Sequence, residues 1–440
     1  MKPKGLLIAV VLLAALGGAI WYSNKKQAAG PAKSATDTTT KLLTITADQF
    51  QEIRIKRLNG ESQDLKLVDG KWRIAEPKPL PADQDAVTSM VTTLSNLAAD
   101  KTIEENAADV KPYGLDIPTL DITITKKDGK TAEVVIGDST PTNSGVYAKL
   151  AGSSKIYTVA SFVKTALDKT VNDLRDKRLL TFDSDKLTRV QLQGKGAAVE
   201  FGKNSQNEWQ ILKPRPLRAD GSQVELLIGK LRDAKMDPLV SDEDAKKAAA
   251  AFAAGTKVAV ATLSDSNGDQ TFDVRKDKDK NYYAKSSVVD GIFKVAADIG
   301  DGLDKGIDDF RNKKLFDFGF SDPTKLEVKG AVYTKSADKW TAGAKTMDNA
   351  SVQSLIDKLR DVSATKFSEK TGGDSVLDAT VTSNAGKKIE KVTIRKQGTE
   401  YFAQRDGEPS IYELDSKTVD DLQAAVSGVK EAAPEPVKKK

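Results

Sequence analysis

Three tryptophans at nearly equal intervals are the feature of this sequence that most restricts its fold. Trp72, Trp209 and Trp340 are separated by 137 and 131 residues, and spacing of this kind indicates internal repetition. The flanking residues repeat as well, since PKPLPAD at 77–83 corresponds to PRPLRAD at 214–220. The third copy lacks these prolines. The chain therefore contains three tandem copies of one unit.

Each copy predicts a helix that begins at an aspartate. Four residues after Asp83, Asp220 and Asp348 an apolar stripe starts, and its spacing of three, four and seven residues puts the side chains on one helix face. The stripes are Val87, Met90, Val91 and Leu94; Val224, Leu227, Ile228 and Leu231; and Val352, Leu355, Ile356 and Leu359. A carboxylate at the start of a helix accepts hydrogen bonds from the free first-turn amides. We therefore interpret the three aspartates as helix N-caps and not as catalytic acids.

Strand signatures also recur three times. Two short alternating segments open each copy, at 53–55 and 65–67, at 190–192 and 199–201, and at 326–328 and 332–333. A hairpin signature follows the helix, with an aromatic residue and an alanine at 147–148, 283–284 and 402–403 and an apolar segment nine residues later at 156–159, 292–295 and 411–414. Such alternation, interrupted by turns that contain glycine, predicts antiparallel hairpins.

A second apolar helical stripe closes each copy. Its members are Val163, Leu167, Val171 and Leu174; Ile299, Leu303, Ile307 and Phe310; and Val419, Leu422, Val426 and Val429. The predicted unit therefore contains two strands, a helix, about four strands and a second helix. Alternating strands joined by tight turns favour an antiparallel sheet with one wetted face and helices on the other. The fold class that we predict is α+β.

The N-terminus predicts a membrane anchor. Residues 5–22 (GLLIAVVLLAALGGAIWY) carry no charge, and as a helix they would span about 27 Å, enough to cross the hydrocarbon layer. The aromatic pair at the end of this segment suits the membrane interface. A cleaved signal peptide is the competing interpretation, because the apolar stretch is only slightly longer than a typical signal core. Both interpretations place the rest of the chain in the periplasm.

These observations give a complete domain plan. We expect a cytoplasmic n-region at 1–4, a transmembrane anchor at 5–22, a flexible linker at 23–40, repeat units at 41–182, 183–318 and 319–430, and a disordered tail at 431–440.

Composition excludes several chemistries. The chain has no cysteine and no histidine, which removes disulfides, thiol nucleophiles, cysteine-based zinc sites and mechanisms that need an imidazole base. Its 68 basic and 63 acidic residues are mixed along the sequence, so a clustered positive footprint for nucleic acid is not indicated. We predict no catalytic, cofactor-binding or metal-binding residues.

One set of motifs deserves comparison with an enzyme family. Residues 161–164 match Ser-x-x-Lys, 205–207 match Ser-x-Asn and 370–372 match Lys-Thr-Gly, in the order found in penicillin-binding proteins. The mechanism would use Ser161 as nucleophile beside Lys164. The three motifs are short, however, and fall in three different repeat units, so that ordinary structural roles are the preferred interpretation.

Three further segments receive structural interpretations. Asp265–Asp269 lacks the downstream glutamate of a calcium loop and predicts a hairpin turn. The charge run at 275–280 predicts a solvated turn. The alanine-rich stretch at 245–254 predicts a short helix between units.

The tryptophan segment, the Asp-capped helix and the Tyr-Ala-Lys hairpin together resemble the bacterial domain-of-unknown-function family 4340. The resemblance extends over nearly all of the chain beyond the predicted anchor. It implies an exported or single-pass envelope protein, of a kind often encoded beside ABC transporter components of the gliding-motility type, and it brings no catalytic residues. The third copy departs from the pattern through its lost prolines.

We therefore expect a non-enzymatic protein held in the inner membrane by its N-terminal helix, with the bulk of the chain in the periplasm. Its expected role is that of an accessory component of an ABC-type envelope transport system, with protein partners and no nucleic acid. An envelope solute- or glycan-binding protein is one alternative. A serine transpeptidase or hydrolase is the other.

Overall fold

The computed structural model describes residues 40–237, 241–320, 323–370 and 372–433. They form two compact units that divide between Asp176 and Lys177. Within these ranges, no helix is both long enough and apolar enough to cross a bilayer. The anchor predicted at 5–22 lies outside the described residues.

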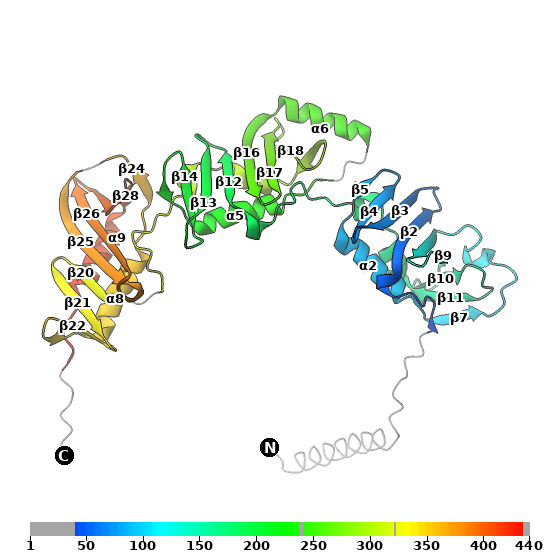
Figure 1. The fold of residues 1–440 in the computed structure, drawn as a ribbon, viewed down its shortest axis with the longest axis horizontal. Coiled ribbons are helices and arrows are strands. Elements are labelled where there is room, and N and C mark those ends of the chain that lie inside the picture. The colour runs from blue at the N-terminus through cyan, green and yellow to red at the C-terminus, as the bar shows by residue number, and fades with distance from the viewer. Residues whose placement is uncertain (1–39, 238–240, 321–322, 371, 434–440) are drawn as a thin grey trace, which may run out of the picture. The chain divides into compact units, whose positions relative to one another are not determined.

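The first unit is built on a nine-stranded antiparallel sheet (Figure 1). Its strand order is β5-β4-β3-β2-β8-β9-β10-β11-β7, and a separate ribbon joins β1 to β6. These strands are β1 (Thr40–Lys41), β2 (Phe50–Arg57), β3 (Ser62–Val68), β4 (Lys71–Glu76), β5 (Leu80–Pro81), β6 (Ala98–Ala99), β7 (Lys101–Glu104), β8 (Leu120–Lys126), β9 (Thr131–Ser139), β10 (Gly145–Leu150) and β11 (Ile156–Ala160).

The second unit contains an eight-stranded and a nine-stranded sheet, both antiparallel. The orders are β15-β14-β13-β12-β16-β17-β18-β19 and β23-β22-β21-β20-β25-β26-β27-β28-β24. The strands of the eight-stranded sheet are β12 (Arg189–Gln193), β13 (Val199–Lys203), β14 (Trp209–Lys213), β15 (Leu217–Arg218), β16 (Thr256–Asp265), β17 (Gly268–Lys276), β18 (Tyr282–Ser286) and β19 (Ile292–Val295). The strands of the nine-stranded sheet are β20 (Lys325–Val328), β21 (Ala331–Ser336), β22 (Lys339–Ala342), β23 (Lys345–Thr346), β24 (Lys366–Ser368), β25 (Asp374–Ser383), β26 (Lys388–Gln397), β27 (Glu400–Arg405) and β28 (Ile411–Leu414).

The three sheets share the same central topology. In each, the first strand of the sheet pairs with a later strand from beyond the first helix, as β2 with β8, β12 with β16 and β20 with β25. The four strands of each sheet that come before the first helix run from one edge to this central pairing, and an additional edge strand, β7 or β24, closes the opposite side of the two nine-stranded sheets. The expected α+β class with antiparallel sheets is confirmed.

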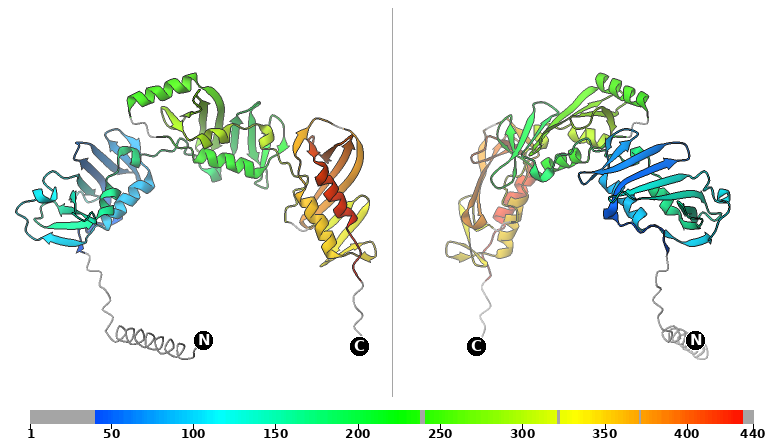
Figure 2. Two further views of the ribbon diagram at one scale, coloured as in Figure 1. Left: turned by 180° about the vertical axis from the view of Figure 1, so that it is seen from behind. Right: turned by 45° about the vertical axis from the view of Figure 1, so that its right-hand side comes forward.

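Helices pack on one face of each sheet, and Figure 2 shows α8 and α9 side by side on the third. The α-helices of the described residues are α2 (Gln84–Ser95), α3 (Ser161–Leu167), α4 (Val171–Leu174), α5 (Gly221–Arg232), α6 (Asp242–Ala254), α7 (Ala297–Leu303), α8 (Asn349–Asp361) and α9 (Ser416–Ser427). The predicted caps are confirmed, because Asp83, Asp220 and Asp348 each accept hydrogen bonds from first-turn amides of α2, α5 and α8. All twelve residues of the stripes predicted for these three helices are buried.

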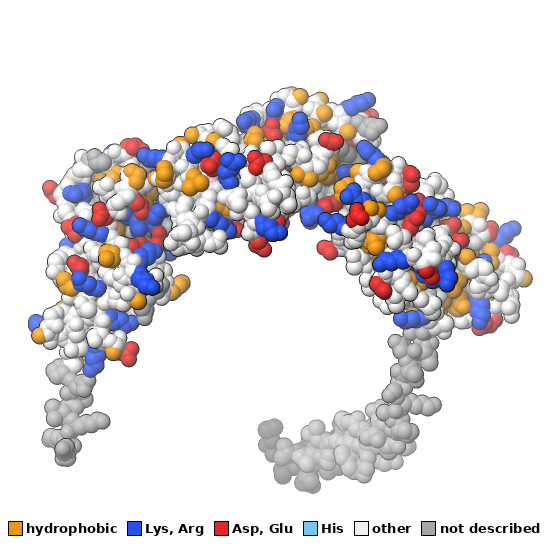
Figure 3. Space-filling view, in the orientation of Figure 1, with side chains coloured by type: hydrophobic (Ala, Val, Ile, Leu, Met, Phe, Trp, Pro, Cys, Tyr) orange, Lys and Arg blue, Asp and Glu red, His pale blue; other side chains and the backbone are white. Residues whose placement is uncertain are grey.

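Each sheet has its own hydrophobic core between the strands and these helices. Along β2, for example, Ile53 and Ile55 are buried while Arg54 and Lys56 are exposed, which is the alternation expected of a sheet with one wetted face. The three repeated tryptophans are buried, one in each core. Over the visible surface, side chains of both charge signs are interspersed (Figure 3).

Two strands of each copy were not predicted from the sequence. The tryptophan segments form β4, β14 and β22, and a two-residue strand follows each of them at the sheet edge. The edge strands have only two residues each, and in the first two copies prolines lie within or beside them, so that the alternation that identifies a strand is weak.

The second helix of each copy was predicted to be continuous, and this is wrong in the first two copies. The helix stops after Leu167, where Arg57 and Gln63 from the sheet both donate to the carbonyl of Lys169 (Gln63 Nε2–O 2.6 Å). In the second copy the amide of Lys195 bonds to the Lys305 carbonyl at 2.9 Å. In both copies, donors from outside the helix therefore bond to the carbonyls of Lys169 and Lys305. A continuing helix would use these carbonyls for its own backbone hydrogen bonds. In the third copy, α9 is uninterrupted.

The alanine-rich stretch forms α6, but it does not lie between repeat units. It connects α5 to β16 within the second copy and packs against β18 and β19. Phe252 anchors it, with the Arg275 guanidinium 4.4 Å from the ring centre. Segment 177–182 likewise belongs to the second core, in which Leu179, Leu180 and Phe182 are buried.

Candidate interaction site

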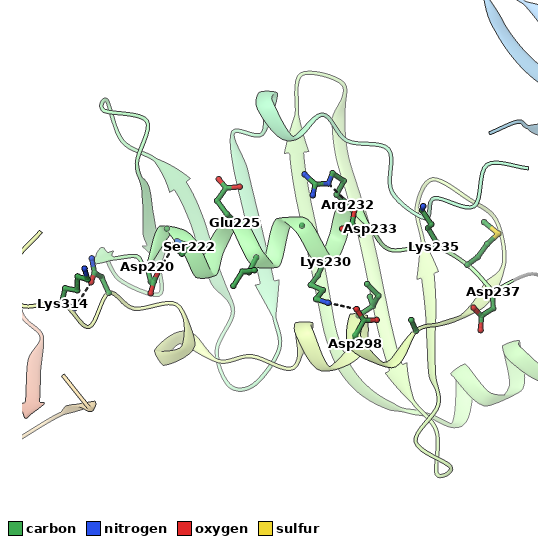
Figure 4. Close-up of a pocket in the computed structure, with 17 residues that line it drawn as sticks. Asp220, Ser222, Glu225, Lys230, Arg232, Asp233, Lys235, Asp237, Asp298 and Lys314 are labelled. Carbon is green, nitrogen blue, oxygen red and sulfur yellow. Dashed lines mark hydrogen bonds and ion pairs between the residues drawn. The ribbon is translucent and has the colours of Figure 1, made fainter. Parts of the chain in front are cut away.

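A groove among the described residues runs along the exposed face of α5 in the second copy (Figure 4). Its volume is about 1220 Å³, and its lining extends from Asp220 at the N-cap of α5 to Asp237 beyond its C-terminus. The other wall comes from the start of α7 and from the chain that leads to the third copy, including Asn312 and Lys314.

Four groove residues form the centre of the exposed face of α5. Ser222, Leu226, Gly229 and Asp233 are spaced by four, three and four residues, and this spacing aligns them in one row on a helix. We call this row the α5 seam. It has the geometry of a helix-packing stripe, although no helix of the described chain covers it.

Leu226 is the apolar centre of the α5 seam. Its side chain is 61% exposed, although every apolar residue of the predicted stripe on the same helix is buried. The corresponding position, six residues after the capping aspartate, is Ser89 in α2 and Ser354 in α8. The leucine is therefore not a requirement of the repeated fold.

Gly229 is the second unusual residue of the α5 seam. Glycine inside a helix lowers stability relative to alanine, so packing usually explains its presence. A Cβ at this position would meet only the Arg232 Nη2 atom, at 3.8 Å. The corresponding residues of α2 and α8 are Thr92 and Asp357. Contacts within the chain thus leave room for a side chain at Gly229.

Charged side chains flank the α5 seam. On one side, Lys230 points toward α7 and its Nζ lies 2.6 Å from Asp298 Oδ2 (Figure 4). The hydrogen bond from Lys230 lowers the pKa of Asp298 below its usual range. On the other side lie Glu225, near the N-terminus of α5, and Arg232, in its last turn. Glu225 also accepts a 2.6 Å hydrogen bond from Trp209 Nε1.

The third copy has a smaller groove in the equivalent place. It measures about 540 Å³ and lies between α8 and α9. Lys358 and Asp421 bridge the two helices at 3.3 Å, as Lys230 and Asp298 do in the second copy. Ser354 stands in this groove where α5 carries Leu226. The two grooves share their place and this bridge, but the apolar centre belongs to the second copy.

A partly buried ionic network joins the second and third copies within the second unit. Arg218, in β15, pairs with the carboxylate of Asp317, and its Nε lies 2.9 Å from Glu408 Oε1. Its Nη2 also donates to the hydroxyl of Tyr412 at 3.1 Å. Burial opposes the charge of Arg218, but the neighbouring carboxylates outweigh this effect and raise its pKa.

Arg405 extends the network within the third copy. Its Nε lies 2.7 Å from Glu408 and its Nη2 lies 3.1 Å from Glu390, whose side chain is only 3% exposed. Glu390 in turn accepts the amide of Asp317 at 2.8 Å. In the second copy neutral groups make the matching contacts: Gln270 accepts the amide of Thr181, and Ser286 donates to the Leu179 carbonyl. The third copy thus uses charged side chains where the second copy uses neutral ones.

The structure does not assemble the three enzyme-like motifs into one site. Ser161 begins α3 in the first unit, whereas the other two motifs belong to the second unit. There Ser205–Asn207 forms the turn between β13 and β14, on a different sheet from Lys370. Lys370 pairs with Glu400 at 2.5 Å, and Thr371 lies outside the described residues.

The acidic segment Asp265–Asp269 is a hairpin turn between β16 and β17, as predicted. Asp265 accepts the amides of Asn267 and Asp183 at 2.7 and 3.0 Å. The run 275–280 likewise ends β17 and leads into the turn before β18. Within the described part of the chain, no group of three or more acidic side chains is arranged to hold a metal ion. Sequence reasoning missed Leu226 and Gly229, although comparing the three aligned helices position by position would have shown both.

Fold and site together define a repeat protein of the α+β class with a partly apolar helix face on its second copy. Its sequence matches the family described as a domain of unknown function, DUF4340, over residues 72–210 and 209–380. The two matched segments cover more than half of the chain and are offset by one repeat, and the chain belongs to this family. No curated protein and no solved structure matches it significantly.

Proposed function

We propose that this chain is a non-enzymatic interaction protein of the bacterial envelope. In this proposal residues 5–22 anchor it in the inner membrane and the three copies stand in the periplasm. The observation that carries the interaction role is the α5 seam. An apolar centre within a rim of charges of both signs is the anatomy of a protein-binding surface, and Leu226 has no counterpart in the other two copies.

The proposed partner is a component of an ABC-type envelope transport system. The support is the expectation attached to the family, together with the length of the chain outside the predicted anchor. A tethered array of copies suits an accessory role, because attachment to the same membrane raises the effective concentration of a partner embedded in it.

Topology can be measured directly because the chain contains no cysteine. Lys247→Cys introduces a single thiol on the exposed side of α6, where the lysine side chain is 69% exposed. A membrane-impermeant maleimide added to intact cells is expected to label Lys247→Cys and to leave Lys4→Cys unlabelled until the cells are lysed. Labelling of Lys4→Cys alone in intact cells would overturn the proposed location.

The interaction role needs a separate test. The full chain, purified from solubilised membranes, is expected to retain the subunits of a transport system. Leu226→Ser should lower their recovery at least fivefold. Leu212→Ser is the matched control, because Leu212 is also partly exposed but lies on β14 outside the groove. Equal recovery with Leu226→Ser and with the wild type would remove the α5 seam as the interaction surface.

A further inference from the structure

The α5 seam has the features of one half of a helix pair. A row of residues spaced by four, three and four is the arrangement through which two helices pack side by side. Leu226 supplies a projecting side chain, and the small residues Ser222 and Gly229 on either side allow close approach of a second backbone. The seam extends over about 18 Å, the length of the twelve residues of α5.

The unexplained glycine points the same way. Gly229 weakens α5, and a Cβ there would meet no atom closer than 3.8 Å within the chain. A side chain at this position would, however, stand between α5 and any helix lying on the α5 seam. Close approach from outside explains why the smallest residue occupies a site where α2 and α8 have larger ones.

The order of charges along one flank of the α5 seam favours one direction for the partner helix. Glu225 lies in the N-terminal half of α5 and Arg232 in its last turn, on the same side of the α5 seam. A partner helix that runs antiparallel to α5 would place its first turn beside Arg232 and its last turn beside Glu225. Acidic residues are favoured in the first turn of a helix and basic residues in the last. Arg232 also lies 3.4 Å from Asp233 of the α5 seam, but both side chains are more than half exposed, and such pairs are weak. In the antiparallel arrangement Asp233 faces the free first-turn amides of the partner helix and Arg232 faces its acidic side chains, so both charges have a partner.

We propose that the α5 seam binds an amphipathic helix of a partner protein, antiparallel to α5, with acidic residues in its first turn and basic residues in its last. This inference rests on the proposed function and adds the chemical class of the partner segment. The recognition is of the helix-in-groove kind, in which one apolar helix face is laid on a complementary surface.

Two synthetic peptides of fourteen residues test the inference against the full chain by fluorescence anisotropy. Peptide A carries glutamates in its first turn, leucines spaced by three and four residues and lysines in its last turn. Peptide B is identical except that the glutamates and lysines are exchanged. Peptide A is expected to bind at least tenfold more tightly than peptide B. Leu226→Ser and Gly229→Ala should each weaken the binding of peptide A at least fivefold, and Leu212→Ser should leave it unchanged.

The readouts separate binding from folding. Gly229→Ala is expected to leave the chain at least as stable as the wild type, so weaker binding by this variant would not be a consequence of unfolding. Equal binding of the two peptides, no binding of peptide A, or binding insensitive to Leu226→Ser would overturn the inference. A dimer of the chain that dissociates on Leu226→Ser would also overturn it, since a second copy would then occupy the seam. Recovery of transport subunits in the experiment on Leu226 and Leu212 tests the proposed function independently of these results.

Discussion

Replacing Arg218 by alanine should loosen the junction between the second and third copies. The Arg218 side chain is 16% exposed and contacts Glu408 and Tyr412 of the third copy and Asp317 of the segment that leads into it. It also donates to the backbone carbonyl of Lys314. Truncation leaves the two carboxylates in place without their shared cation.

The size of the effect follows from the partners that remain. Removing one member of a buried ion pair destabilises a protein by about 3–5 kcal/mol when the other charge is left uncompensated. Here Glu408 keeps Arg405 and the Tyr412 hydroxyl, each at 2.7 Å, and Asp317 keeps the Asn312 amide at 3.0 Å. We therefore expect a smaller loss, about 2–3 kcal/mol of local stability.

Hydrogen exchange of the full chain measures this local stability. The amide of Leu315 bonds to the Val362 carbonyl, and the amide of Ala364 bonds to the Lys313 carbonyl, so both report on the junction. Their exchange should accelerate about 30- to 140-fold in Arg218→Ala, since each 1.4 kcal/mol is a factor of ten.

Arg189→Ala is the matched control for this prediction. Arg189 and Asp269 form an exposed pair at 3.5 Å, and such pairs contribute about 0–1 kcal/mol. If Arg218→Ala and Arg189→Ala changed the exchange of the junction amides by the same small factor, the ionic network would not be what holds the junction.

Three further predictions concern stability. Gly229→Ala should stabilise the second copy by about 0.5–1 kcal/mol, seen as slower exchange of α5 amides, because the added methyl group meets no close atom. Asp348→Ala should destabilise α8 by about 1 kcal/mol in the same assay, because it removes the 2.8 Å hydrogen bond to the Ser351 amide; an unchanged α8 would contradict the cap. Burial raises the pKa of Tyr412, so its contribution is complete below the unfolded value of about 10 and is lost as pH rises through the folded pKa. The wild type should therefore lose more stability than Tyr412→Phe between pH 9 and 11, measured by urea denaturation followed through tryptophan fluorescence.

Local patterns in the sequence were enough to predict the first helix of each copy and its cap. Each capping aspartate and its apolar stripe act over three or four residues, within one turn or two of a helix, so that their geometry is visible in the sequence. The hairpins of each copy were predictable for the same reason, because their alternation is local.

Features that depend on distant residues were not predictable. The break after Leu167 requires Arg57 and Gln63, more than a hundred positions earlier in the chain. Arg218 and Tyr412 are 194 positions apart, and nothing around either residue indicates the other. A pattern of apolar spacing describes which face of a segment is buried, but it does not show which side chains compete for its backbone.

The candidate site was predictable from the sequence only in part. When α5 is considered alone, nothing distinguishes Leu226 from other exposed leucines, which are common in proteins. It becomes informative only when α5 is compared with α2 and α8, because the repeated fold then serves as its own reference. The groove around it, in contrast, depends on where α7 begins and could be located only in the structure.

The most direct test of the central claim, that the α5 seam is an interaction surface, is photo-crosslinking in intact cells. A benzophenone amino acid is placed in turn at Ser222, Leu226 and Asp233 of the α5 seam, and at Ser354 of α8 as the matched position. We expect one discrete adduct, of the same mass, from all three seam positions and none from position 354. Equal adduct yields at all four positions, or none at the seam, would contradict the account.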